Sequence, residues 1–347
     1  MLENDARYVL LKDWLTRDLG LAPLRIEPAS ADASFRRYFR SYHADGSYIV
    51  MDAPPEQEDV RPYLHVTSML ESLGAHVPKV HHSDTARGLL LLEDLGSTHY
   101  LSSLGAGGAD PDVLYGEALA ILAQVQVRGA ATARTLPPYD REALAREFAL
   151  MQPWFMGRHL EITLGEAESR MLQDAMEFLI AEALAQPQVF VHRDYHSRNL
   201  MVLPERSPGI IDFQDALYGP IGYDLVSLLK DCYISWPRER VLRWLREHRA
   251  RLASLGGPVG QDETQFVRWF DLIGVQRHIK VLGIFARLWY RDGKIGYIKD
   301  LPLTLGYVQE ACGLYPELAP LGRFLESDVA PRLPAANQRA NAAAGLA

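Results

Sequence analysis

The chain has 347 residues and a formal net charge of -8, with 48% hydrophobic and 23% charged residues. This composition is typical of a globular protein, and the acidic balance argues against a dedicated nucleic-acid binder, which needs a basic surface to contact phosphates. Two cysteines, Cys232 and Cys312, are too few for a disulfide framework and fit a reducing compartment. Since no apolar run approaches the ~20 residues of a membrane span and no signal peptide is recognised, we expect a cytoplasmic protein without a membrane partner.

The first part of the chain combines helix and strand patterns. Apolar residues recur at helical spacing over residues 5–19, and two strand patterns, 34–42 and 48–51, flank the turn sequence His-Ala-Asp-Gly. These two strands are therefore predicted to form a hairpin. A further helix is predicted over 61–73, and a strongly apolar strand over 88–92 is ended by Glu-Asp-Leu-Gly.

From about residue 112 onward the pattern is mainly helical, and residues 335–347 are rich in alanine and predicted to be frayed or weakly helical. The sequence thus predicts a strand-rich lobe over 1–95, a larger helical lobe over 96–334, and a tail. The helices predicted in the second lobe are 112–128, 141–151, 167–185, 220–234, 237–255 and 262–292.

Two short apolar strands in the helical half carry polar residues at regular spacing. In Val-His-Arg-Asp-Tyr-His-Ser-Arg-Asn, Asn199 follows Asp194 by five positions, and Asp212 begins the turn after the next strand, in Ile-Ile-Asp-Phe. Phosphoryl transfer needs one carboxylate to orient or deprotonate the acceptor hydroxyl, and oxygen ligands to hold Mg²⁺. We therefore predict Asp194 as the base and Asn199 and Asp212 as Mg²⁺ ligands. Capping of turns by the same side chains is the alternative, but the combination with His196 favours catalysis.

These residues resemble the catalytic loop and metal-binding turn of the protein-kinase-like superfamily. His196 stands where protein kinases commonly have lysine, as it does in the aminoglycoside phosphotransferase and choline kinase branch. The resemblance implies an α+β, two-lobed protein-kinase-like fold that binds ATP between its lobes. It also implies that Glu93, Asp94 and Leu95 contact adenine, that His196 supports the loop, and that Asp224 braces it.

The spacing after the metal turn indicates the size of the acceptor. Only eleven residues separate Asp212 from Asp224, which is too few for the long segment on which a protein substrate docks. A small-molecule acceptor is therefore predicted.

The sequence departs from the kinase pattern at the site of the phosphates. Residues 48–55 contain no lysine, the helix over 61–73 contains a single acid, Glu71, and residues 28–35 offer small residues instead of a glycine-rich loop. Our hypothesis is that an arginine of the neighbouring strand supplies the missing positive charge, the alternative being a solvated strand face. The candidates are Arg36, Arg37 and Arg40. The departures also leave open a catalytically silent nucleotide-binding protein.

Two segments of the helical half are candidates for the acceptor pocket. Trp154 lies beside a proline break and could stack on a sugar, although a core position is favoured. Residues 268–300 hold seven Lys or Arg and three Asp, which suits an anionic or neutral acceptor better than a cationic one. In this segment Arg277, His278 and Lys280 flank apolar positions, so that one of them could point inward.

Over most of its length, and most strongly over residues 191–236 and 275–302, the chain resembles the bacterial N-acetylmuramate/N-acetylglucosamine anomeric kinases of peptidoglycan recycling. The resemblance implies an amino-sugar substrate whose anomeric hydroxyl is phosphorylated by ATP to give the α-1-phosphate. A lactyl carboxylate on N-acetylmuramate would fit the basic segment. A kinase of another small alcohol, such as an aminoglycoside, choline or homoserine, is the alternative. Nothing in the sequence indicates an oligomeric state.

Overall fold

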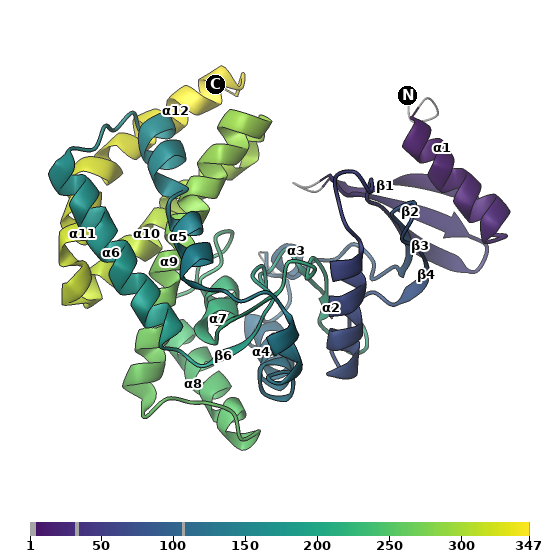
Figure 1. Cartoon of the computed structure of the whole chain (residues 1–347), viewed down its shortest axis with the longest axis horizontal. Helices are drawn as coiled ribbons and strands as arrows, with labels where there is room; N and C mark the ends of the chain where they lie inside the picture. Colours follow the sequence, from purple (N-terminus) through teal and green to yellow (C-terminus); the bar gives the residue numbers. More distant parts are fainter. Residues whose placement is uncertain (1–4, 32–34, 106–107, 347) are drawn as a thin grey trace. The chain divides into compact units, whose positions relative to one another are not determined.

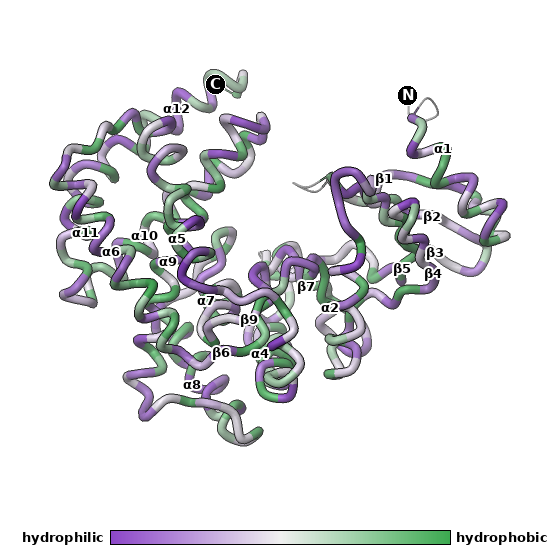
Figure 2. Tube along the Cα trace, viewed as in Figure 1, coloured by the Kyte–Doolittle hydropathy of each residue, from purple (hydrophilic) through white to green (hydrophobic). Residues whose placement is uncertain are grey.

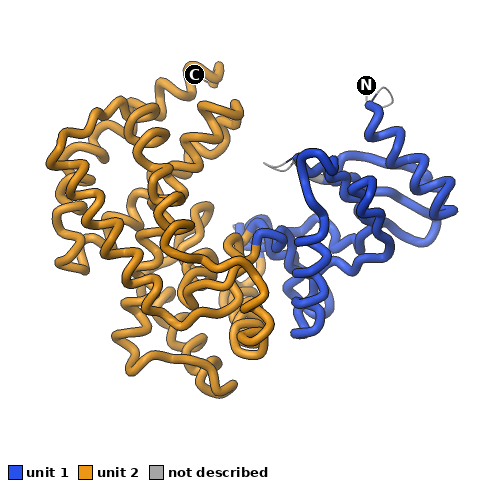
Figure 3. The backbone as a smooth tube through the Cα atoms, viewed as in Figure 1, with its two compact units in different colours: residues 1–108, 198–215 blue, residues 109–197, 216–347 orange. Residues whose placement is uncertain are grey.

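The computed structural model describes residues 5–31, 35–105 and 108–346, which form two compact units (Figure 3). Unit 1 comprises residues 1–108 and 198–215, and unit 2 comprises residues 109–197 and 216–347. The predicted boundary after residue 95 therefore does not follow the compact units. Residues 198–215 belong to unit 1 because their backbone bonds to it: Val202 N donates to Thr98 O and Ile210 N donates to His76 O, both at 2.8 Å.

Unit 1 is built on a five-stranded antiparallel sheet in the order β1-β2-β3-β5-β4 (Figure 1). The predicted hairpin is β2 and β3, and β5, with its run of four leucines, is coloured as strongly hydrophobic in Figure 2. The elements of unit 1 are α1 (Ala6–Asp13), η2 (Trp14–Asp18), β1 (Arg25–Ala31), β2 (Arg37–His43), β3 (Gly46–Asp52), α2 (Arg61–Ser72), β4 (Val80–Asp84), β5 (Leu89–Glu93), α3 (Tyr100–Ser103), β7 (Leu200–Met201) and β8 (Gly209–Ile210).

The two faces of this sheet have different roles because side chains alternate along a strand. Phe39 and Val50 are paired across β2 and β3, and both belong to a buried cluster with Leu11 and Trp14 of the N-terminal helical segment. The next pair, Arg40 and Ile49, lies on the opposite face, where it lines a cavity. One face of the sheet thus forms the core of the unit, and the other is available for binding.

Strand β1 was not predicted. The small residues expected to form a loop over 28–35 lie partly in this strand, because Arg25–Ala31 pairs with β2, with an irregularity between Pro28 and Ser30. Proline is tolerated there because β1 is an edge strand. Residues 32–34 of the expected loop lie outside the described residues.

Unit 2 is mainly helical, with a short pair of strands, β6 and β9, and the 30-residue helix α9 packed against α6, α7, α10 and η4 (Figure 1). Gly283 permits the close crossing with η4, since a Cβ atom there would lie 2.5 Å from the backbone of Leu150. The elements of unit 2 are α4 (Pro111–Arg128), η3 (Thr132–Thr135), α5 (Arg141–Phe148), η4 (Met151–His159), α6 (Glu166–Leu184), β6 (Gln188–Val191), β9 (Leu217–Pro220), α7 (Gly222–Leu229), α8 (Arg238–Ser254), α9 (Glu263–Asp292), η5 (Ile295–Asp300), α10 (Leu301–Leu314), η6 (Pro316–Leu318), α11 (Ala319–Phe324), η7 (Leu325–Val329), η8 (Ala330–Arg332) and α12 (Leu333–Ala343).

Two helical predictions in unit 2 need correction. The helix predicted over 141–151 continues as the π-helix η4, and the helix predicted over 220–234 ends at Leu229. Of the two alternatives for the tail, frayed or weakly helical, the structure shows a helix, α12, as far as Ala343. This helix is held because Ala336 and Ala340 are buried in the large apolar cluster of the unit.

Two fully buried histidines predict how stability depends on pH. Burial lowers the pKa of His248 to about 3, and burial together with Arg277 lowers the pKa of His278 to about 3, against an ordinary value of 6.5. Below pH 6.5 the unfolded chain therefore binds protons that the folded protein does not. Each histidine should stabilise the fold fully above pH 6.5 and progressively less as the pH falls toward 3, by about 1.4 kcal/mol per pH unit.

We expect the free energy of unfolding of His248→Gln, measured by urea denaturation, to fall less steeply between pH 6 and pH 4 than that of the wild-type protein. His82→Gln is a suitable control because His82 is exposed on β4. Equal pH slopes for His248→Gln and the wild type would show that His248 is not buried in its neutral form.

Both cysteines are buried and neither forms a disulfide. None of the helices in the described part of the chain has the length and apolar character required to span a bilayer.

Candidate active site

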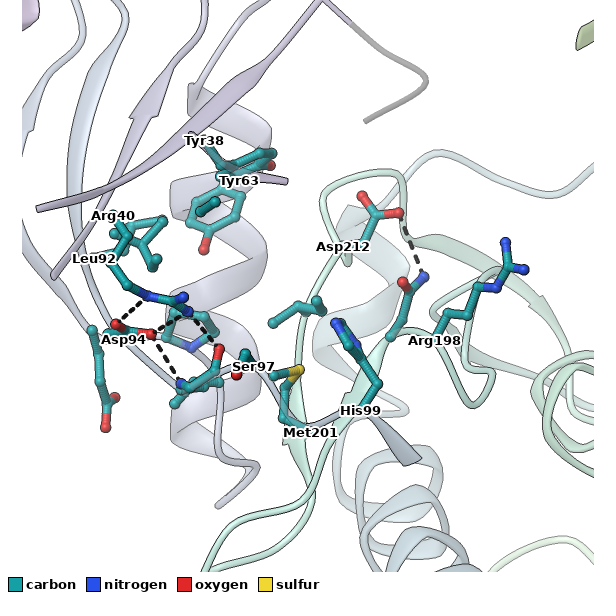
Figure 4. Close-up of a pocket in the computed structure, with 18 residues that line it drawn as sticks. Tyr38, Arg40, Tyr63, Leu92, Asp94, Ser97, His99, Arg198, Met201 and Asp212 are labelled. Atoms are coloured by element: carbon teal, nitrogen blue, oxygen red, sulfur yellow. Dashed lines mark hydrogen bonds and ion pairs between the residues drawn. The ribbon is translucent and has the colours of Figure 1, made fainter. Parts of the chain in front are cut away.

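A cavity of about 390 Å³ lies within unit 1, against the face of the sheet that α1 does not cover (Figure 4). Its walls combine residues of β2, β3 and β5 with residues of the segment 198–212. Glu93, Asp94 and Leu95, the residues implied to contact adenine, all lie in its wall. The described lining residues are Ala29, Tyr38, Arg40, Ile49, Tyr63, Pro78, Leu92, Glu93, Asp94, Leu95, Gly96, Ser97, His99, Arg198, Asn199, Met201, Ile211 and Asp212.

The segment after β5 is fixed by the side chain of Asp94. Its carboxylate accepts bonds from Arg40 Nε (2.7 Å), Arg40 Nη2 (3.0 Å), Ser47 Oγ (2.7 Å) and the backbone N–H of Gly96 (2.9 Å). Burial opposes ionisation, but these bonds, first of all that from Arg40, hold the pKa of Asp94 below its ordinary value. A ligand bound at this wall would therefore contact a backbone segment that these hydrogen bonds hold in place.

The predicted metal ligands lie side by side at the other wall of the same cavity. Asn199 Nδ2 donates to Asp212 Oδ2 (3.5 Å) (Figure 4). Gln214 Nε2 also donates to Asp212, at Oδ1 (2.8 Å). Asp212 has φ 63°, a left-handed conformation that is strained for a residue with a side chain and is common at functional sites. Phe213 is fully buried and packs on Tyr63 of α2, with ring centroids 4.8 Å apart, which fixes the turn.

These residues fit a bound Mg²⁺. An amide and a carboxylate are the hard oxygen donors that this ion prefers, and the remaining positions of its octahedron are usually filled by water and phosphate oxygens. Among the described residues no group of three or more His, Cys, Asp or Glu is arranged for a metal ion. One carboxylate and one amide beside a cavity are nevertheless a sufficient protein contribution for Mg²⁺ bound with a nucleotide.

Asp194 and His196 lie in unit 2, where two buried aspartates hold the loop that carries them. Asp224 accepts the backbone N–H groups of His192 (2.7 Å) and Arg193 (3.0 Å), at the start of the loop. Burial raises the pKa of Asp224 to about 7 against the effect of these two bonds. These two bonds attach the start of the loop to α7, and the bracing role implied for Asp224 stays a prediction.

Asp231 holds the other end of the loop and was not recognised in the sequence. It is fully buried, and it accepts bonds from the backbone N–H (2.9 Å) and the hydroxyl of Ser197 and from the backbone N–H of Tyr233 (3.0 Å). The ring of Tyr233 meets that of His196 edge-on, with centroids 5.4 Å apart. The sequence does contain a signal for Asp231, because it is a carboxylate directly after an otherwise apolar helix. A carboxylate in such a position is buried only when it accepts hydrogen bonds.

Asp194 itself lies among cations. Burial would raise the pKa of Asp194, but Lys280, His196, Arg277 and Arg193 outweigh it and hold the pKa below its ordinary value. The carboxylate is therefore ionised at neutral pH. It can accept a hydrogen bond from a hydroxyl group and take up its proton as that group becomes acidic.

Lys280 and Arg277 both point inward, but each already has partners within unit 2. Lys280 Nζ lies 3.0 Å from Glu147 Oε1 and 3.0 Å from the hydroxyl of Tyr223, and its relative exposure is 6%. Arg277 Nη1 contacts Cys232 Sγ at 3.7 Å. This arrangement is a buried charge network beside Asp194, in which Glu147 also binds Arg193. A contact of either side chain with a sugar stays a prediction.

Two further predicted residues can be placed. Trp154 of η4 is half-buried and packs against the large apolar cluster of unit 2, which is the core position favoured from the sequence. His278, the third inward candidate of α9, is buried, and its Nε2 lies 2.9 Å from Lys230 O.

A model of the phosphotransferase enzyme family matches residues 25–264, and the chain belongs to this family. The predicted α+β protein-kinase-like fold is also confirmed: a choline kinase from Streptococcus pneumoniae superposes with a TM-score of 0.61 over 90% of this chain and 98% of its own, at 14% identity. Two curated relatives are named N-acetylmuramate/N-acetylglucosamine kinase. The one from Pseudomonas aeruginosa is 44% identical, covering 94% of this chain and 98% of its own, and the one from Pseudomonas putida is 43% identical, covering 94% and 97%.

Proposed function

We propose that this protein is an ATP-dependent amino-sugar kinase that phosphorylates the anomeric hydroxyl of N-acetylmuramate, N-acetylglucosamine or both, to give the sugar 1-phosphate. The observation that carries the proposal is the similarity over 94% of the chain to kinases named for these two sugars. The cavity of unit 1, with Asn199 and Asp212 side by side in its wall, supports it, since a nucleotide and its metal ion need such a site. A cytoplasmic role in peptidoglycan recycling is consistent with this chemistry.

In this proposal the residues of unit 1 bind the nucleotide, and the residues of unit 2 act on the sugar. In unit 1, the backbone at Glu93–Leu95 would contact adenine, and Asn199 and Asp212 would hold Mg²⁺, which would supply positive charge to the phosphate oxygens. In unit 2, Asp194 orients the sugar hydroxyl. As the hydroxyl oxygen bonds to the γ-phosphorus and the bond to the β–γ bridging oxygen breaks, Asp194 accepts the hydroxyl proton. His196 supports the loop, as its contact with Tyr233 suggests.

The proposal is tested by measuring ATP consumption with N-acetylmuramate, N-acetylglucosamine, choline and kanamycin. We expect turnover with one or both amino sugars, and ³¹P NMR of the product should show a phosphate on carbon 1 rather than carbon 6. Turnover with choline or kanamycin alone would make the protein a kinase of another small alcohol. No turnover with any acceptor, but retained nucleotide binding, would favour a silent nucleotide-binding protein.

The role of Lys280 can be distinguished by a pH profile. If Lys280 acts through Asp194, the variant Lys280→Met should raise the pKa of Asp194, because the largest of the cationic influences on that carboxylate is removed. The acidic limb of the profile of kcat/KM against pH should then move to higher pH.

A direct contact of Lys280 with the sugar would instead raise the KM for the sugar at every pH and leave the limb in place. Lys299→Met, a change of an exposed lysine in η5, is the matched control and should alter neither quantity.

A further inference from the structure

The three candidate arginines of unit 1 each lie close to an acidic side chain of the same unit. The contacts are Arg36 Nη2 to Asp212 Oδ1 (3.8 Å), Arg37 Nη2 to Asp52 Oδ2 (2.6 Å) and Arg40 Nε to Asp94 Oδ2 (2.7 Å). A contact of any of these arginines with a phosphate stays a prediction.

In unit 2 an acid outside the predicted site, Glu147 near the end of α5, contacts three side chains from different segments. Its Oε1 lies 3.0 Å from Lys280 Nζ of α9 and also binds Nη2 of Arg193, in the loop that carries Asp194. Its Oε2 accepts a hydrogen bond from the buried hydroxyl of Tyr139. Burial would raise the pKa of Glu147, but these three contacts hold it below its ordinary value, so the side chain is ionised at neutral pH.

The loop residue that Glu147 binds is held in an unusual conformation. Arg193 has φ 78°, a left-handed conformation that is strained for a residue with a side chain. Its backbone N–H donates to Asp224 Oδ1 (3.0 Å), its carbonyl accepts a bond from the hydroxyl of Ser227 (3.1 Å), and its guanidinium binds Glu147. Asp194 is the next residue, so the direction of its side chain depends on how Arg193 is held.

Glu147 also limits how the nearby cations act on Asp194. The charged and titratable groups that act on Asp194 are Lys280, His196, Arg277, Arg193 and Asp224. Two of these, Lys280 and Arg193, share the carboxylate of Glu147. Without this acid the two cations would be left in a buried environment, where a charge that has lost its partner is costly, and both would be drawn toward Asp194.

We propose that Glu147 is a positioning residue for the catalytic base. It holds Arg193 and Lys280 at fixed places beside Asp194, so that the carboxylate of Asp194 stays directed at the acceptor hydroxyl rather than bound by these cations. The inference rests on the proposed function in that Asp194 is the base. It does not depend on which alcohol is phosphorylated.

The test combines steady-state kinetics, with whichever acceptor gives turnover, and hydrogen exchange of the full-length protein measured by mass spectrometry. Glu147→Gln should lower kcat by roughly 10- to 100-fold, because the base is misplaced, while the affinity for ATP stays within about twofold of the wild-type value. Retained ATP affinity verifies that the variant is folded. Glu147→Asp, which keeps the charge, should recover part of the loss. The backbone amides of residues 192–197 should exchange faster in Glu147→Gln than in the wild type.

The pH profile separates positioning from a purely structural role. Lys280→Met should move the acidic limb of kcat/KM to higher pH, and adding Glu147→Gln removes the opposite charge of the same pair, so the limb should move back to lower pH. The double variant keeps the net charge of the network, and it therefore serves as the test if Glu147→Gln alone does not fold. A residue that only stabilised the fold would leave the limb where Lys280→Met puts it.

Glu142→Gln is the matched control, because Glu142 lies on the same helix but is exposed and pairs with Arg146 at the surface. Its kcat, exchange rates and pH profile should equal those of the wild type. The assignment is overturned by a kcat of Glu147→Gln within about twofold of the wild-type value, by unchanged exchange of residues 192–197, or by an unchanged limb in the double variant. Turnover with a different alcohol would overturn only the proposed acceptor, whereas a wild-type protein without turnover on any acceptor would overturn Asp194 as base and this assignment with it.

Discussion

Asp194→Asn is expected to lower kcat by roughly 10²- to 10⁴-fold while the affinity for ATP stays within about twofold of the wild-type value. Asparagine has the size and shape of aspartate but cannot accept the hydroxyl proton. The backbone of the loop should keep its conformation, because Asp224 and Asp231 hold its two ends independently of residue 194. The measurement is steady-state kinetics with the amino sugar that gives turnover, together with calorimetric titration of ATP.

Asp174→Asn is the control for this experiment, since Asp174 is exposed on α6 and should tolerate the same change without loss of kcat. A kcat of Asp194→Asn above about a tenth of the wild-type value would contradict the role of Asp194 as base. A comparable loss of ATP affinity would mean instead that the residue binds the nucleotide.

Asp212→Ala should abolish the contribution of Mg²⁺ to nucleotide binding. Among the described lining residues, Asp212 is the carboxylate that is hydrogen-bonded to Asn199, so its removal leaves the amide as the predicted ligand for the ion. We expect the ratio of ATP affinities with Mg²⁺ and with EDTA to fall on the order of 100-fold relative to the wild type, corresponding to a loss of several kcal/mol of charge stabilisation. Asn199→Ala should reduce the same ratio by a smaller factor, because an uncharged ligand is lost.

Asp215→Asn is the matched control for Asp212→Ala. It removes a negative charge from the same turn, but the side chain of Asp215 is 60% exposed and it lies outside the cavity wall. Its Mg²⁺ dependence should equal that of the wild type. An Asp212→Ala variant that still binds Mg-ATP more tightly than ATP alone, by the wild-type factor, would contradict the assignment of the metal ligand.

The local elements of the fold were largely predictable, and the exceptions have identifiable causes. The hairpin β2–β3, strand β5 and helix α9 follow from alternation, apolar runs and helical spacing, which depend on neighbouring residues. Strand β1 was missed because it contains Pro28 and small residues, and it is strand only through pairing with β2. Helix α12 was predicted only weakly because its alanines show little apolar periodicity. Burial against the rest of unit 2 stabilises it.

The residues of the candidate site can also be divided into those that were predictable from local sequence and those that were not. Asp194, Asn199 and Asp212 could be predicted because phosphoryl transfer requires side-chain oxygens at a short, recognisable spacing along the chain. Asp231 was not predicted because Ser197, whose backbone it binds, lies 34 positions away, and no local sequence pattern indicates such a contact.

The sequence by itself determined the class of protein, and it predicts the chemistry of the candidate site, because the spacing from Asp194 to Asp212 and the strand and helix patterns are local properties of the chain. Only the tertiary structure decided which arginine lies beside Asp212, which acids hold the loop of Asp194, and that Lys280 is enclosed by Glu147 and Tyr223. The physical reason is that strand pairing and helix packing determine the direction and the partners of each charged side chain. Both depend on contacts between segments that are distant in sequence.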